Sequence, residues 1–370
     1  MAALTHDIPR QQVTDAIALL MDNLVNIKDE TGEFLLHLDD GRIIDTKGWA
    51  GWEWTHGVGL FGMWRYYEQT GDKAALAIIK QWFEDRFAEG TPTKNINTVA
   101  PFITLAYLYE HEPDPRYIPY LDTWAEWLMA PDGLPKTEEG GFQHIVYNDE
   151  NPGEMWDDTL MMSVLPLAKI GLLLNRLHYV EEAKRQFLGH IKYLFDKKTG
   201  LWFHGWDFNG RHNFAEALWA RGNCWVTIAI PEIIEILDLP QGDALRMFLI
   251  DTLAAQVKTL AETQDESGLW HTLIVDPTSY LEASAAAGFA YGILKAVRKG
   301  YLPRHYEAVG IKAVRGVLAN IDETGELKQV SFGTAMGDTQ QFYKDIALTS
   351  MPYGQSLAVC ALAEFLRTYI

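Results

Sequence analysis

The chain has 370 residues, of which 48% are hydrophobic, so it is long enough to bury a large core. Its 31 Lys and Arg residues against 50 Asp and Glu residues give a formal net charge of −19, which disfavours nucleic acid and anionic membranes as partners. The two cysteines, Cys224 and Cys360, are too few for a disulfide framework and lie in apolar stretches. We expect both to be buried free thiols in a reducing compartment.

The N-terminal residues 1–12 contain no apolar segment behind basic residues, and no long uncharged apolar run occurs elsewhere. These features predict a cytoplasmic protein without a membrane anchor. The sequence is rich in aromatic residues, and many of its 13 tryptophans stand beside Gly, Asp, Asn or His rather than within apolar runs. This placement indicates an aromatic-lined binding site.

Apolar residues recur with helical spacing in twelve segments. The first helix is predicted from Val13, Ile17, Leu20, Met21 and Leu24. The other eleven are expected at residues 51–69, 73–88, 96–111, 116–130, 158–176, 179–194, 222–238, 242–262, 281–299, 303–320 and 353–369.

The connections between these segments alternate in length. Those before the odd-numbered helices are short, as in tightly packed helical hairpins, whereas those before the even-numbered helices are mostly long. Five of the long connections share a turn-like phrase, at Gly32, Gly133, Gly200, Gly268 and Gly325. We therefore predict an all-α fold, a closed (α/α)6 barrel of six hairpins with the long loops on one rim, in a single domain over residues 1–370. An open α-solenoid is the alternative.

Few familiar motifs are present. Gly57, Gly59 and Gly62 form a G-x-G-x-x-G sequence, but a strand does not precede it, so close helix packing is favoured over dinucleotide binding. The sequence contains no H-E-x-x-H, C-x-x-C, Walker or G-x-S-x-G motif. We expect no metal and no cofactor.

The segment 154–162, before the sixth helix, combines Trp156 with the adjacent carboxylates Asp157 and Asp158. In one interpretation Asp157 caps the helix and Asp158 favours its dipole. In the other, one of the two points into the barrel mouth, where burial beside Trp156 and repulsion from its neighbour raise its pKa for acid catalysis. The sequence leaves both open.

Other polar and aromatic residues also stand before even-numbered helices, which places them on the same rim. Arg221 is either a surface cation stacked on a tryptophan or a planar fork that grips a carboxylate. The remaining candidates for substrate binding are Trp54, Asn97, His144, His204, Trp219, Trp225 and Tyr343.

In sequence and in order, the segments 155–162, 204–207 and 219–225 resemble those of the unsaturated rhamnogalacturonyl hydrolases of glycoside hydrolase family 105. These enzymes are related to the unsaturated glucuronyl hydrolases of family 88. The resemblance spans most of the chain and implies the same (α/α)6 barrel. It also implies a substrate, a small oligosaccharide left by a polysaccharide lyase, whose non-reducing uronic acid has a double bond between C4 and C5. In such enzymes an Asp protonates C4, water adds at C5, and the product opens and releases the next sugar.

By this resemblance Asp158 is the catalytic residue, with Asp157 as the alternative. His204, Trp219, Arg221 and Trp225 are expected to line the sugar pocket. Asn97 stands where some relatives have Asp, so it cannot share the proton. Cys224 replaces a glycine, a small change that we expect to be tolerated.

Three other functions remain open at this point. The first is hydrolysis of unsaturated glucuronyl units from glycosaminoglycans. The second is a sugar 2-epimerase on the same barrel, which would use histidines as acid and base; its candidates are His56, His144, His204, His212 and His271. The third is noncatalytic sugar binding.

Overall fold

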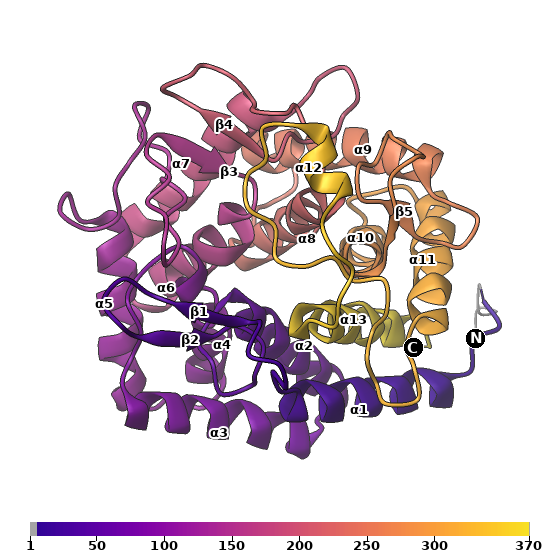
Figure 1. The fold of residues 1–370 in the computed structure, drawn as a ribbon, viewed down its shortest axis with the longest axis horizontal. Coiled ribbons are helices and arrows are strands. Elements are labelled where there is room, and N and C mark those ends of the chain that lie inside the picture. Colours follow the sequence, from indigo (N-terminus) through magenta and orange to yellow (C-terminus); the bar gives the residue numbers. More distant parts are fainter. Residues whose placement is uncertain (1–5, 370) are drawn as a thin grey trace.

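The computed structural model describes residues 6–369, and its helices form two concentric rings (Figure 1). The inner ring consists of α2 (Trp54–Thr70), α4 (Phe102–His111), α6 (Leu165–Leu173), α8 (Ala220–Ile236), α10 (Ala283–Arg298) and α13 (Pro352–Phe365). Each inner helix contacts the next, and α13 contacts α2. The ring is therefore closed, which confirms the (α/α)6 barrel and shows that the open solenoid was wrong.

The outer ring covers the inner one with amphipathic helices. It consists of α1 (Arg10–Asn26), α3 (Lys73–Glu89), α5 (Ile118–Met129), α7 (Leu177–Leu194), α9 (Ala244–Thr263) and α11 (Glu307–Ala319). In α1 the buried residues are Val13, Ile17, Leu20, Met21 and Leu24, the set that the helical spacing predicts. The outer helix α1 packs on the last inner helix α13, so the two ends of the chain complete the sixth pair (Figure 1).

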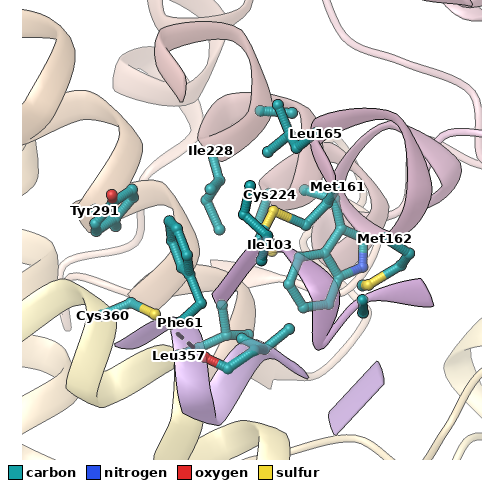
Figure 2. Close-up of a cluster of buried hydrophobic side chains, with 14 of the residues drawn as sticks. Phe61, Ile103, Met161, Met162, Leu165, Cys224, Ile228, Tyr291, Leu357 and Cys360 are labelled. Atoms are coloured by element: carbon teal, nitrogen blue, oxygen red, sulfur yellow. Dashed lines mark hydrogen bonds between the residues drawn. The ribbon is translucent and has the colours of Figure 1, made fainter. Parts of the chain in front are cut away.

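The inside of the inner ring is filled by side chains. Figure 2 shows apolar residues from all six inner segments converging, among them Phe61, Ile103, Leu165, Ile228 and Leu357. Both cysteines are buried free thiols in this region, as expected. Because the centre is packed, a substrate can approach only from an end of the barrel.

The glycines of the G-x-G-x-x-G sequence lie inside α2 and allow close helix contact. A Cβ at Gly57 would lie 2.7 Å from the Ala100 carbonyl carbon, and one at Gly62 would lie 2.9 Å from Cys360 Sγ. The packing interpretation of this motif is confirmed.

Several predicted helix boundaries were wrong. The segment 96–111 is a short 3-10 turn, Asn97–Val99, followed by α4, because Pro101 lacks an N–H and fits only a first turn. The segment 158–176 begins with a π-helical turn, Leu160–Val164, before α6. A short helix, α12 (Gln340–Lys344), lies in the last long connection.

The long loops meet on one rim, where three short antiparallel pairs of strands tie them together. The pairs are β1 (Leu35–His37) with β2 (Ile43–Asp45), β3 (Glu154–Trp156) with β4 (Gly205–Asp207), and β5 (Trp270–His271) with β6 (Leu281–Glu282). The β3–β4 pair positions the site, because the Asp157 N–H donates to the His204 carbonyl at 3.0 Å. Two segments about 47 residues apart in the sequence are thereby held side by side.

The opposite end of the barrel is closed by buried ion pairs. Glu232 is fully buried in α8, lies 2.5 Å from Arg65 of α2 and also pairs with Lys295 of α10. Among residues 6–369, no helix combines the length and the apolar character that a bilayer span requires.

Candidate active site

A cleft of about 480 Å³ opens among the loops that precede the inner helices. The sequence-predicted residues that line it are Trp54, Asn97, His144, Asp158, Trp219 and Arg221. The inner helices α2, α8 and α13 begin at residues that line the cleft, Trp54, Trp219 and Met351, so the partial positive charges of these N-termini lie beside it. This arrangement favours an anionic substrate and the ionised form of a carboxyl at the cleft floor.

Asp157 and Asp158 occupy different environments. Asp157 is fully buried, and neither of its carboxyl oxygens has a hydrogen-bond partner, so the helix-capping interpretation is wrong. Asp158 retains 17% side-chain exposure and lines the cleft. Gly222, in the first turn of α8, lies against Asp157: a Cβ there would be 2.5 Å from Asp157 Oδ2, so only glycine leaves room for this carboxyl.

The two carboxyls titrate as a pair. Burial, followed by repulsion from Asp158, raises the pKa of Asp157 well above its ordinary value. Burial also opposes ionisation of Asp158, but contact with His204 outweighs it and lowers the pKa of Asp158 to about 2. As pH rises, Asp158 is therefore the first of the pair to ionise, and Asp157 is the one that retains its proton.

His204 is held by groups on both sides of its ring. Its Nε2 lies 3.4 Å from Asp158 Oδ2, and its Nδ1 lies 2.8 Å from the Tyr343 hydroxyl. That hydroxyl accepts the Gly337 N–H, so its own proton can be donated to His204 Nδ1. This places the imidazole proton on Nε2, facing Asp158. His204 and Tyr343 are both buried and, contrary to expectation, neither lines the cleft; His204 instead contacts Asp158, and Tyr343 contacts His204.

His144 lies on the cleft wall and is kept neutral. Its ring stacks on Trp156 with centroids 4.1 Å apart, and its Nδ1 lies 2.9 Å from Thr159 Oγ1. Burial lowers the pKa of His144 to about 3. A neutral histidine at this position suits hydrogen bonding to a sugar hydroxyl rather than charge pairing.

Arg221 is buried, so its interpretation as a surface cation is wrong. The guanidinium lies between the rings of Trp219 and Tyr353, 4.8 Å from each centroid. Its Nη atoms donate to the carbonyls of Ser331 and Phe332, at 3.1 and 3.0 Å, to Ser331 Oγ at 2.5 Å and to Thr334 Oγ1 at 2.9 Å. The fully buried Glu282 lies 3.7 Å from Nη1, so a carboxylate of the protein already pairs with this cation. Arg221 therefore also anchors the loop 331–334, which forms part of the cleft wall.

Trp225 does not line the cleft, contrary to expectation. It is fully buried in α8 and meets Trp54 edge to face, with centroids 5.5 Å apart. Trp54 stacks on Tyr353 at 4.6 Å, and these two rings line the cleft. Trp225 acts as the support of the aromatic wall.

Several residues of the cleft were not predicted from the sequence. Glu53 precedes α2 and caps it together with His56; burial raises the pKa of Glu53 to about 7. The Glu-x-x-His spacing before a helix was a readable capping signal. Tyr353 and the 332–336 loop enter the cleft through contacts with Arg221, for which the sequence carries no local signal.

The Asp157→Asn variant is expected to be more stable than the wild type at neutral and alkaline pH. In the unfolded chain Asp157 ionises near its ordinary pKa, whereas in the folded protein it keeps its proton. The folded state therefore loses stability as pH rises above that ordinary value, and Asn removes the loss. Thermal unfolding from acidic to alkaline pH should show a gain that grows with pH. Asp251→Asn, an exposed change on α9, should show none.

The Tyr343→Phe variant is expected to lower kcat by about tenfold with little change in KM, because the imidazole loses the hydroxyl that fixes its tautomer. Steady-state kinetics measure the effect. Tyr67→Phe is a matched control, since the Tyr67 hydroxyl lies 2.8 Å from His111 Nε2 in an exposed position far from the rim. Equal effects of the two changes would contradict the role given to Tyr343.

Comparisons with known proteins identify the family of the chain. The family model described as Glycosyl Hydrolase Family 88 matches residues 26–369. The unsaturated rhamnogalacturonyl hydrolase YesR of Bacillus subtilis is 32% identical over 320 residues, which cover 86% of this chain and 90% of that protein.

Two solved structures are still more similar. A possible member of the GH105 family from Salmonella enterica is 62% identical, with a TM-score of 0.98 over 100% of this chain and 97% of that one. A possible GH105 member from Klebsiella pneumoniae is 60% identical, with a TM-score of 0.97 over 100% of this chain and 96% of that one. The chain is a glycosidase that belongs to glycosyl hydrolase family 88, within the group that includes the GH105 enzymes.

Proposed function

We propose that this enzyme removes a 4,5-unsaturated uronic acid from the non-reducing end of lyase-generated rhamnogalacturonan oligosaccharides. The observation that carries the proposal is the Asp157–Asp158 pair at the floor of the cleft. Among the described residues that line this cleft, Arg221 is the one Lys or Arg. The pair keeps one proton for transfer, and the cation matches the single carboxylate of the uronic acid. The name of the Bacillus subtilis relative supports the same substrate.

Asp158 is the acid and base of the proposed reaction. The proton held by the pair moves from Asp157 to Asp158, which delivers it to C4 of the vinyl ether. A water molecule then gives its proton to the Asp158 carboxylate as its oxygen bonds to C5. The ring oxygen leaves C5, which becomes a ketone, and the hemiacetal at C1 collapses to an aldehyde and expels the next sugar. The pair ends with the one proton that it had at the start.

The remaining cleft residues orient the substrate. Arg221 supplies positive charge toward the carboxylate while its Nη atoms hold the loop 331–334. Trp54 and Trp219 stack against sugar faces, and Asn97 and His144 bind hydroxyls or the attacking water. The side chain of Asn97 is available for this role, since Asn95 Oδ1 instead accepts the N–H groups of Asn97 and Thr98, at 2.9 Å each. His204 and Tyr343 hold Asp158 in place.

The alternative activities have less support. A sugar 2-epimerase needs two histidines that exchange protons near neutral pH, yet of the five loop histidines only His144 lines the cleft, and its pKa is about 3. Noncatalytic binding disagrees with membership of a glycosidase family. Hydrolysis of unsaturated glycosaminoglycan disaccharides shares the same chemistry and is separated by the assay below.

The test is the loss of ultraviolet absorbance from the conjugated double bond when the purified protein meets unsaturated galacturonyl-rhamnose. We expect a falling signal with release of rhamnose, and slower turnover of chondroitin and heparin lyase products. Because Asp157, Asp158 and His204 offer ligand atoms within 4.8 Å of one another, a parallel reaction contains EDTA, and its rate should be unchanged. A constant signal with every unsaturated substrate would refute the proposed function.

The setting of the enzyme is part of the same proposal. We place it in the cytoplasm as a single domain that acts on a small oligosaccharide, without nucleic acid or membrane partners. The buried free thiols Cys224 and Cys360 and the net charge of −19 support this setting.

A further inference from the structure

The cleft contains many carboxyl groups for a site that receives an acidic sugar. Besides Asp158, four acidic side chains line it: Glu53, Asp149, Glu154 and Asp338. We call these four the cleft carboxyls. Arg221 is the one Lys or Arg among the lining residues described; the loop 331–334 already accepts hydrogen bonds from both of its Nη atoms, and the buried Glu282 lies 3.7 Å from Nη1.

The cleft carboxyls lack cationic partners. Within residues 6–369, none of the four lies within 4.0 Å of a Lys or Arg nitrogen, although acidic residues elsewhere on the surface form many such pairs. Glu53 is 6% exposed, and its carboxyl accepts hydrogen bonds from backbone N–H groups at the start of α2, among them that of Trp54 at 3.1 Å. Glu154 accepts the Trp156 Nε1–H at 2.8 Å. Their negative charge is therefore directed into the cleft without local compensation.

Three of the cleft carboxyls already influence one another. Burial, and then the negative charges of Asp207, Asp149 and Asp338, raise the pKa of Glu154 above its ordinary value. Asp149 and Asp338 are exposed, whereas Asp158 lies at the floor. Once the uronic acid occupies the floor, the leaving sugar lies nearer the mouth, where these exposed carboxyls stand.

We propose that the cleft carboxyls make the enzyme selective for substrates with a single anionic group, so that a sulfate or a second uronate on the leaving sugar is rejected. This inference rests on the proposed function. One cation at the floor is matched to one carboxylate, and a second anion would meet four carboxyls and no free cation. Juxtaposed like charges of this kind suppress binding of the wrong partner.

The experiment compares unsaturated galacturonyl-rhamnose with the same disaccharide carrying a 3-O-sulfate on its rhamnose, at low salt and pH 8. The wild type is expected to show a kcat/KM about 100-fold lower for the sulfated substrate. Raising the ionic strength to about 1 M shortens the screening length to about 3 Å. The difference in kcat/KM between the two substrates should then become several-fold smaller.

Variants separate charge from shape. Asp149→Asn and Asp338→Asn change exposed residues and leave the fold intact. Together they should reduce the ratio of kcat/KM between the unsulfated and the sulfated substrate about tenfold. Glu53→Gln should narrow it further. Asp251→Asn removes an exposed charge on α9, away from the rim, and should leave the ratio unchanged.

The outcomes distinguish the two proposals. No turnover of either disaccharide would refute the proposed function itself. Turnover of the unsulfated substrate with an equal rate on the sulfated one would overturn the charge selectivity alone. Discrimination that neither salt nor the asparagine variants alter would show that the sulfate is rejected by its size, which also overturns the inference.

Discussion

Replacing Asp158 with asparagine is expected to lower kcat by about 10²–10⁴, the usual contribution of a general acid and base. Asparagine keeps the size of the side chain but cannot carry the proton to C4 or take one from water. KM should change little, because the aromatic walls and Arg221 still hold the sugar. Initial rates of absorbance loss over a range of substrate concentrations measure both parameters.

Two further variants make this result specific to Asp158. Asp157→Asn removes the proton reservoir but leaves Asp158 in place, so its rate should lie between those of the wild type and Asp158→Asn. Asp251→Asn should behave as the wild type. Near-normal activity of Asp158→Asn together with an inactive Asp157→Asn would move the catalytic role to Asp157.

The Arg221→Lys variant is expected to raise KM by about 10- to 100-fold, since a hydrogen bond to a charged group contributes about 1.5–3 kcal/mol. A lysine ammonium cannot reproduce the planar fork that contacts Ser331, Phe332 and Thr334 and receives a carboxylate. The loop 331–334 loses an anchor as well, so the melting temperature should fall. Saturation kinetics and thermal unfolding measure the two effects.

Arg211→Lys is the matched control for this change. Arg211 is exposed and pairs with Glu138 at 2.6 Å, so the same substitution there should leave KM and stability close to wild type. An unchanged saturation curve for Arg221→Lys would mean that the substrate carboxylate binds elsewhere, and that Arg221 serves the loop alone.

The overall fold was predictable because it depends on two local properties of the sequence. Helical spacing of apolar residues identified the twelve main helices, and the alternation of short and long connections identified their pairing. The positive φ angles of Gly32, Gly200, Gly268 and Gly325 confirm the repeated turn, whereas Gly133 does not share that conformation. The helix starts were less predictable, because Pro101 and the π-helical turn at Leu160–Val164 depend on local backbone chemistry.

The candidate site was only partly predictable. Residues directly before inner helices, such as Asp158 and Trp219, could be placed on the rim from topology. The sequence could not show which of these side chains face the cleft, because the local backbone decides the direction of each one. Trp225 points into the core, and Asp157 is buried behind Asp158. The contacts of Arg221 with residues 331–334 join segments about 110 residues apart, and no local pattern reveals them.

The most direct test of the account is the fate of the proton that Asp158 delivers. The reaction is run in heavy water and stopped early, before the ketone product exchanges, and the product is examined by proton NMR. We expect one deuteron at C4 on a single face, since one fixed carboxyl supplies it. Deuterium on both faces, or release of rhamnose without deuterium at C4, would show that the enzyme does not protonate the double bond.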